Sequence, residues 1–267
     1  MMIKYGNVIL FGSGETSETG KSIHRHVLQR LYGKQSICIL ETPAGFQPNS
    51  RLVAESIAQI FKFSLAEFVN EIVIIPARKK KSAFSPDDKK ILRPLDYATY
   101  IFLGPGSPTY AVEQLKDSLA FESIKKRWRQ GTTLCFSSAA VLAMGTYTLP
   151  VYEIYKAGFD LYWEKGLDLF AETFLKIVII THWNNKEGGS GLDTSRCYMG
   201  RERFENLVKL LPDNIMILGI EEQTAIIIDF EKNVFSIDGT GNAILRRKNK
   251  EIVFEKNTLY PLSLFRR

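Results

Sequence analysis

Short apolar runs rich in β-branched residues recur along the chain, and the stretches between them are long enough to hold helices. The runs cover residues 7–11, 36–41, 71–76, 99–104, 132–137, 176–182 and 214–220. Runs that are apolar almost throughout are typical of strands buried on both faces of a parallel sheet, because helices cover such a sheet on both sides. The alternation of strands and helices therefore predicts an α/β protein.

Two of the intervening stretches show helical periodicity with a clear end. Apolar residues recur at helical spacing over residues 23–31 and over residues 204–211, and a glycine or a proline follows each pattern. Ser85 and Ser107 are each followed by proline, as is common where a side chain caps a helix and proline occupies its first turn. Helices are expected to begin at both pairs.

The pattern changes after Gly219. Residues 223–229, 233–238, 243–246 and 251–254 are spaced like short strands joined by tight turns, which indicates an antiparallel meander. The predicted architecture is a three-layer, open, mostly parallel sheet with an antiparallel C-terminal extension. Residues 1–267 are expected to form a single domain, since no internal repeat or low-complexity linker interrupts the chain.

Composition excludes several classes of protein. With 45% hydrophobic and 24% charged residues the chain has enough apolar material for a core, so it is not disordered. Its net charge of +6 is spread along the chain among both signs, which argues against a nucleic-acid partner. No run approaches the roughly 18 apolar residues of a membrane span, and the first residues lack the apolar stretch of a signal peptide. We therefore expect a cytoplasmic protein without a membrane partner.

The three cysteines, Cys38, Cys135 and Cys197, show no Cys-x-x-Cys spacing. An odd number without this spacing fits a reducing compartment and argues against a zinc knuckle. No disulfide, metal or other cofactor is expected.

One strand leads directly into a helix start made of small residues, which is the setting of a nucleophile elbow. Residues 134–145 include Ser137 and Ser138 at this turn, followed by Ala139 and Ala140. Ser138 is the preferred nucleophile, because the small alanines allow a backbone N–H to approach a substrate oxygen. The alternative is that the two serines only cap a helix.

A base for this serine has few candidates, because the chain has three histidines. His24 and His26 fall inside a helical period, where a surface or core role is expected. His182 ends a predicted strand, on the same sheet edge as Ser138. A structural histidine at a strand end is the alternative.

Two further loops follow predicted strands. Residues 102–110 contain two glycines before a capped helix, so the Gly106 amide is a candidate oxyanion donor, unless the loop is only a tight turn. Residues 219–225 place Glu221 and Glu222 at a strand end, where a carboxylate could orient His182.

A phosphate-binding loop is a competing interpretation. Residues 14–22 are close to the GxxxxGK[ST] pattern, but the spacing is one residue too long, and Glu15 stands where the first glycine belongs. Asp229 would be a distant choice of magnesium ligand. We do not favour this interpretation, because the Glu15 carboxylate would face the phosphates.

These loops, in this order, resemble the dipeptidase E and cyanophycinase family of serine peptidases over most of the chain. The matching segments are Leu10-Phe-Gly-Ser-Gly-Glu15, Gly104-Pro-Gly-Ser107, Phe136-Ser-Ser-Ala-Ala-Val141, His182 with the later Arg201 and Arg203, and Gly219-Ile-Glu-Glu-Gln-Thr-Ala225. The last match is the most specific.

The resemblance implies a flavodoxin-like, class I glutamine amidotransferase-like fold and cleavage of a small peptide or related amide, with acidic aspartyl substrates favoured. It places the catalytic groups on Ser138, His182 and Glu222. Dipeptidase E-like members instead take the third group from a position that corresponds to Glu153. Oxyanion donors fall on Gly106 and Ala139, and substrate contacts on Ser107, Asn184, Arg201 and Arg203. A homodimer is left open.

A second hypothesis remains beside the hydrolase. Phe136 and Ala140 stand where the family elbow has glycines, and the stretch between His182 and Arg201 is longer than its equivalent in the family. These departures also fit an inactive relative that binds a ligand or a partner. Glutaminase chemistry is not expected, because glutamine amidotransferases use cysteine at the elbow and a glutamate where this chain has Asn184.

Overall fold

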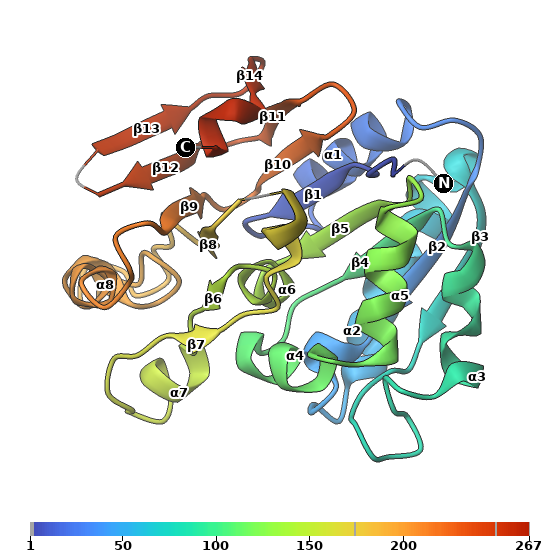
Figure 1. The fold of residues 1–267 in the computed structure, drawn as a ribbon, viewed down its shortest axis with the longest axis horizontal. Helices are drawn as coiled ribbons and strands as arrows, with labels where there is room; N and C mark the ends of the chain where they lie inside the picture. The colour runs from blue at the N-terminus through green and yellow to red at the C-terminus, as the bar shows by residue number, and fades with distance from the viewer. Residues whose placement is uncertain (1–2, 174, 249, 267) are drawn as a thin grey trace.

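An eight-stranded sheet forms the centre of the computed structural model, which describes residues 3–173, 175–248 and 250–266 (Figure 1). Five neighbouring strands are parallel. In spatial order they are β3 (Val69–Ile75), β2 (Gln35–Leu40), β4 (Tyr100–Leu103), β5 (Thr133–Ser137) and β1 (Val8–Phe11). Beyond β1 the sheet continues with antiparallel strands β10 (Thr224–Asp229), β11 (Val234–Gly239) and β14 (Leu259–Pro261).

Helices cover both faces of this sheet. Successive residues of a strand point to opposite faces, and apolar residues lie on both of them. On one face Ile9 and Phe11 pack with α1 (Glu18–Leu28) and α2 (Ser50–Gln59). On the other face Val8 and Leu10 belong to the cluster that contains α4 (Pro108–Leu115), α5 (Leu119–Trp128) and α6 (Ala139–Ala143). The predicted three-layer α/β class with a mostly parallel sheet and an antiparallel extension is confirmed.

A second, four-stranded sheet lies beside the central one. Its strands, in spatial order, are β13 (Lys250–Phe254), β12 (Ala243–Arg247), β9 (Met216–Ile220) and β8 (Ile177–Ile180). Helix α8 (Gly200–Val208) packs on it through Phe204 and Leu207 (Figure 1). The sequence predicted β8 and β9 within the central sheet, which is wrong. A tight turn with Gln223 at φ +52° separates β9 from β10, so that only β10 pairs with β1.

In Figure 1, strands β6 (Tyr147–Thr148) and β7 (Glu164–Lys165) and helix α7 (Val151–Tyr155) lie at the lower left, and helix α3 (Lys89–Leu92) lies at the right. Strands β6 and β7 form a short hairpin beside α7, while α3 follows β3. Ser107 caps α4 as predicted, with its hydroxyl accepting from the Tyr110 amide. The predicted helix start at Ser85 is wrong. Asp88, whose carboxylate accepts from the Lys90 amide, caps α3 instead.

One large buried cluster joins the two sheets. It contains Leu10 and Ile226 of the central sheet together with Ile179, Leu218 and Leu245 of the second sheet. On this ground we keep a single domain over residues 1–267 as a proposal. In the described part of the chain, no helix has the length and apolar character that a membrane crossing needs.

Candidate active site

Ser138 occupies a sharp turn between β5 and α6. Its backbone has φ +50° and ψ −115°, a conformation that residues other than glycine rarely adopt. Phe136 and Ala140, at the positions where glycines were expected, are fully buried in the core beneath this turn. Both side chains pack inward, and Ser138 takes the apex of the turn although neither of these positions is glycine.

The end of β1 holds the backbone of both Ser138 and His182. The Ser138 amide donates to the Phe11 carbonyl and the His182 amide donates to the Gly12 carbonyl, each at 3.3 Å. His182 also has a positive φ, of +50°. Two consecutive carbonyls thus bring together residues that lie 44 positions apart in sequence.

A chain of hydrogen bonds links three of the predicted residues. Ser138 Oγ lies 3.0 Å from His182 Nε2, and His182 Nδ1 lies 3.0 Å from Glu222 Oε1. The ionised carboxylate only accepts, so Nδ1 carries the proton and Nε2 is free to accept from the serine hydroxyl. This is the tautomer that a general base next to a serine requires.

Two asparagines fix the position of Glu222. The side-chain amide of Asn185 donates to the same Oε1 atom at 2.7 Å, and the backbone amide of Glu222 donates to Asn184 Oδ1 at 2.9 Å. The hydrogen bond from His182 is the main reason that the pKa of Glu222 lies below its ordinary value, and Asn185 adds to the effect. The carboxylate therefore stays ionised beside the imidazole.

Glu153, the competing carboxylate, lies in a different network. Its Oε1 accepts from Thr109 Oγ1 at 2.6 Å, and Thr109 Oγ1 lies 2.9 Å from Ser107 Oγ. Its other oxygen is buried without a hydrogen-bond partner among the described residues. The structure thus places Glu222, and not Glu153, against the His182 ring.

The two predicted oxyanion donors flank the serine. Gly106 and Ala139 line the same cavity as Ser138 and His182. Ala139 is the first residue of α6, so its N–H has no acceptor within that helix. Gly106 has φ +151°, and a Cβ atom built on it would lie 1.8 Å from the Pro43 carbonyl oxygen, so this loop requires glycine.

The cavity beside Ser138 measures about 290 Å³. Its lining consists of Gly106, Pro108, Ser138, Ala139, Leu142, Val151, Tyr152, Tyr155, Lys156, His182, Glu187, Cys197 and Tyr198. The tyrosines, Lys156 and Glu187 were not predicted from the sequence. Glu187 and Tyr198 belong to the long stretch between His182 and Arg201.

The four predicted substrate-binding residues lie outside this lining. Ser107 caps α4, Asn184 accepts from the Glu222 amide, and the Arg201 amide donates to Asp193. The Arg203 guanidinium donates to the Met199 and Tyr198 carbonyls, 2.7 and 3.0 Å away. In the structure Arg203 thus braces the backbone that carries Tyr198, because its side chain turns back along α8.

The other histidines and the glycine-rich segment have local roles. His24 is buried beside Tyr100, and His26 pairs with Asp238 on the surface. In the segment that resembles a phosphate loop, the Gly20 amide donates to Ser17 Oγ and the Lys21 ammonium pairs with Glu18. These groups are already engaged within the turn, which argues against a phosphate cradle.

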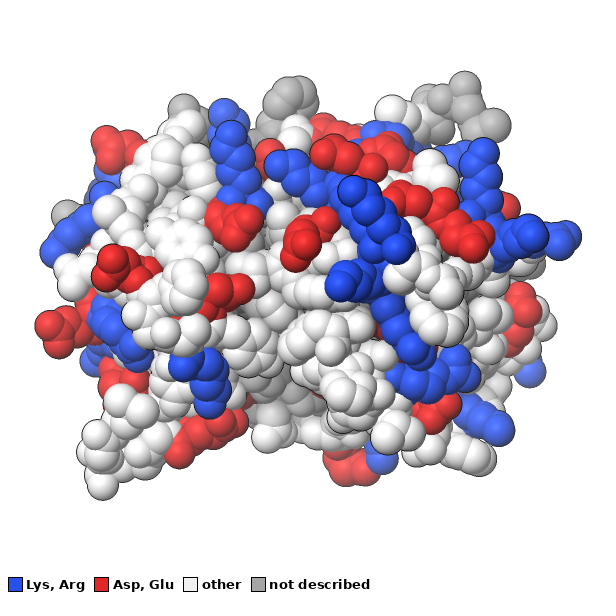
Figure 2. Space-filling view, turned by 90° about the horizontal axis from the view of Figure 1, so that it is seen from below, with Lys and Arg blue, Asp and Glu red and all other residues white. Residues whose placement is uncertain are grey.

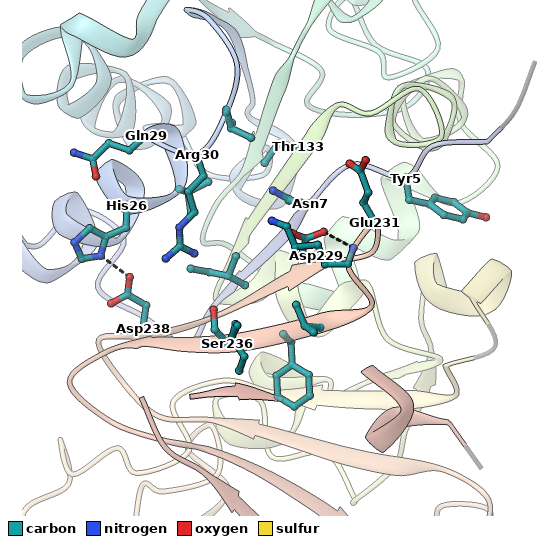
Figure 3. A pocket seen from close by; sticks show the side chains of 18 of the residues that line it. Tyr5, Asn7, His26, Gln29, Arg30, Thr133, Asp229, Glu231, Ser236 and Asp238 are labelled. Atoms are coloured by element: carbon teal, nitrogen blue, oxygen red, sulfur yellow. Dashed lines mark hydrogen bonds and ion pairs between the residues drawn. The ribbon is translucent and has the colours of Figure 1, made fainter. Parts of the chain in front are cut away.

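A wider depression of about 880 Å³ lies near the amino ends of the parallel strands (Figure 3). Asn7 and Thr133 stand beside it, and its polar side chains include His26 and Asp238, which share a hydrogen bond. Open α/β sheets place their ligands outside the carboxyl ends of the strands. The smaller cavity at Ser138 is therefore the candidate active site.

Two solved structures resemble the chain along nearly all of its length. A peptidase from an acI-B1 Actinobacterium superposes with a TM-score of 0.77 at 16% sequence identity, covering 98% of each chain. A candidate Peptidase E protein from Listeria monocytogenes EGD-e superposes with a TM-score of 0.56 at 14% identity, covering 96% of this chain and all of the other. The chain shares its fold with these proteins. No protein-family model and no curated protein matches its sequence.

Proposed function

We propose that the chain is a serine hydrolase of the dipeptidase E and cyanophycinase type, which cleaves a peptide or a related amide bond. The observation that carries this proposal is the hydrogen-bonded series of Ser138, His182 and Glu222 at a cavity beside the carboxyl end of β5. The names of the two structural relatives, both described as peptidases, support the same class of substrate.

The geometry supports a two-step reaction. Ser138 Oγ attacks the carbonyl carbon and gives its proton to His182 Nε2, 3.0 Å away. The C–N bond then breaks, His182 returns the proton to the leaving amine, and an ester of Ser138 remains. Water, deprotonated by His182, attacks that ester, and the released serine oxygen takes back the proton.

The charge that develops on the carbonyl oxygen needs donors close to Ser138. The amides of Ala139 and Gly106 are proposed for this role, since both residues line the cavity with Ser138. Glu222 is proposed as the group that holds the His182 tautomer and stabilises the imidazolium formed during proton transfer. Glu153, bonded to Thr109, is not proposed as a catalytic residue.

The proposal includes a small peptide substrate and a cytoplasmic location. A cavity of about 290 Å³ accommodates one or two side chains, not a folded protein. The cytoplasmic location is inferred from the three buried cysteines, which carry no disulfide.

Hydrolysis of a defined peptide mixture, followed by mass spectrometry, tests the proposal. The wild-type chain and the Ser137→Ala variant are expected to cleave peptides, because the Ser137 hydroxyl is buried and lacks a partner among the described residues. The Ser138→Ala variant is expected to lose cleavage by about a thousand-fold or more. Wild-type protein that binds peptides without cutting them would favour the inactive relative instead.

A further inference from the structure

The cavity beside Ser138 is lined by buried apolar side chains and by aromatic rings. Leu142 and Val151, which are 1% and 7% exposed, belong to its lining. Tyr152 and Tyr155 come from α7, and Tyr198 from the loop before α8, so that three rings converge from two separate segments. Such a surface is complementary to apolar or aromatic groups.

The charged side chains at the cavity do not favour an acidic substrate. In the described lining Lys156 and Glu187 contribute opposite charges. Lys156 Nζ lies 4.8 Å from the centre of the Tyr155 ring, and Glu187 Oε2 accepts the Tyr198 hydroxyl at 3.1 Å. Neither arginine expected to bind a carboxylate lines the cavity. The Arg203 guanidinium lies 5.9 Å from the centre of the Tyr155 ring, but it donates to the Met199 and Tyr198 carbonyls.

The aromatic surface continues from the cavity onto the outside of the molecule. Tyr152 is 39% exposed, and its ring centre lies 6.4 Å from that of Phe46, which is 49% exposed. Phe46 in turn lies 5.2 Å from the ring of Tyr110. The face below α4 and α7 is largely white in its middle, while most Lys and Arg side chains gather on its right-hand half (Figure 2). We call Phe46, Tyr110 and Tyr152 the aromatic shelf.

We propose that the cavity and the aromatic shelf bind a large apolar or aromatic side chain next to the scissile bond, so that the enzyme selects apolar peptides. This inference rests on the proposed hydrolase function. Tyr152 connects the two surfaces, because it lines the cavity and also belongs to the shelf, beside Phe46. A substrate side chain placed there would lie beside Ser138, and its burial would contribute to binding.

A peptide library with equal amounts of each residue on both sides of the cut site tests the inference. Cleavage is expected to be at least about ten-fold enriched for Phe, Tyr, Trp, Leu or Met on one side. Enrichment for Asp or Glu, or cleavage without a preference, would overturn the inference while leaving the hydrolase function intact. Complete absence of cleavage would count against the hydrolase function.

Binding to the Ser138→Ala variant tests the cavity separately from catalysis. Matched peptides that contain Phe or Asp are compared by calorimetry, and the Phe peptide is expected to bind more tightly. Equal or weaker binding of the Phe peptide would contradict the inference even if no peptide is ever cleaved.

A matched pair of tyrosine variants identifies the surface responsible. Tyr152→Ala is expected to lower kcat/KM for the preferred apolar substrate by about 10- to 100-fold. Tyr97→Ala removes a tyrosine that is 52% exposed and lies outside the lining, so it should leave kcat/KM unchanged. Equal effects of the two substitutions would overturn the assignment to Tyr152.

Discussion

Glu222 and Glu153 were both candidates for the third catalytic residue on the sequence, and in the structure they have different partners. Glu222 contacts the His182 ring, whereas Glu153 contacts Thr109 beside the Gly106 loop. Replacing Glu222 by glutamine allows its amide to donate to Nδ1 and so favours the wrong imidazole tautomer. We expect Glu222→Gln to lower kcat by about a thousand- to ten-thousand-fold, measured on the peptide that the wild-type chain cleaves best.

Glu153→Gln is the matched control for this prediction. The amide oxygen of glutamine can still accept from Thr109, so kcat is expected to fall by less than about ten-fold. A larger loss in Glu153→Gln than in Glu222→Gln would assign the third catalytic role to Glu153.

His24 is expected to make stability depend on pH. Burial in the core lowers the pKa of His24 to about 4, because the charged imidazolium is disfavoured there. An unfolded histidine titrates near pH 6.5, so the unfolded chain takes up this proton first as the pH falls. The free energy of unfolding should therefore drop by about 3 kcal/mol between pH 6.5 and pH 4 through this residue.

Denaturant unfolding of the wild-type chain and His24→Gln measures this contribution. The glutamine side chain stays neutral, so the variant should lose less stability than the wild-type chain over the same pH range. Identical pH dependence in the two proteins would show that His24 is not the titrating group.

Individual residues also show what sequence analysis can and cannot predict about the site. Ser138, His182 and Glu222 were predicted because each follows a strand. The expectation that one sheet edge brings them together is wrong, because β5 lies in the central sheet and β8 and β9 in the second sheet; the end of β1 holds Ser138 and His182 together instead. The tyrosines of the cavity lie in a short helix and an irregular loop, whose course depends on tertiary contacts. Arg203 was misassigned, because its place in the sequence gave no sign that the side chain turns back to the Met199 carbonyl and is half-buried there.

At the level of elements, the end of β1 and the turn after β9 approach each other closely beside the site. A Cβ atom on Gly12 would lie 2.1 Å from the Glu221 carbonyl oxygen, and the Gly12 carbonyl accepts from the His182 amide. Gly12→Ala must therefore push the Glu222 turn away from His182. We expect it to destabilise the protein by about 1–3 kcal/mol and to lower kcat by about a hundred-fold.

Thermal unfolding and kcat of Gly12→Ala are compared with those of Gly191→Ala. A Cβ atom on Gly191 meets no atom within 4 Å, so this control should keep both properties. A Gly12→Ala variant with wild-type activity would show that the catalytic geometry does not depend on this contact.

The positions of strands and helix starts along the chain were predictable where local sequence signals are strong. Buried strands and the cap at Ser107 were predicted with small shifts at their ends. The separate sheet of β8, β9, β12 and β13 was not, because strand partners depend on the turn at Gln223 and on contacts between distant segments. Ser85 does not cap a helix, because its hydroxyl accepts from the Asp87 amide within a turn and the helix begins only after Asp88.

Across the whole molecule, the three cysteines are free and at most 4% exposed. Burial raises the pKa of Cys38 and of Cys197 to about 12, and it also raises the pKa of Cys135. Thiols that stay protonated and covered react slowly. A chromogenic thiol reagent should therefore detect three thiols in denaturant and almost none in the native protein within minutes. Rapid native reaction of even one thiol would contradict this burial.

We propose that the chain as a whole assembles a reactive serine, Ser138, at the end of β5. A fluorophosphonate probe forms a bond to an activated serine oxygen, and tandem mass spectrometry locates the adduct. We expect one label per chain on Ser138, absent from Ser138→Ala, retained in Ser137→Ala and strongly slowed in His182→Ala. An unlabelled wild-type chain across a broad pH range, or a label that persists in Ser138→Ala, would contradict the account.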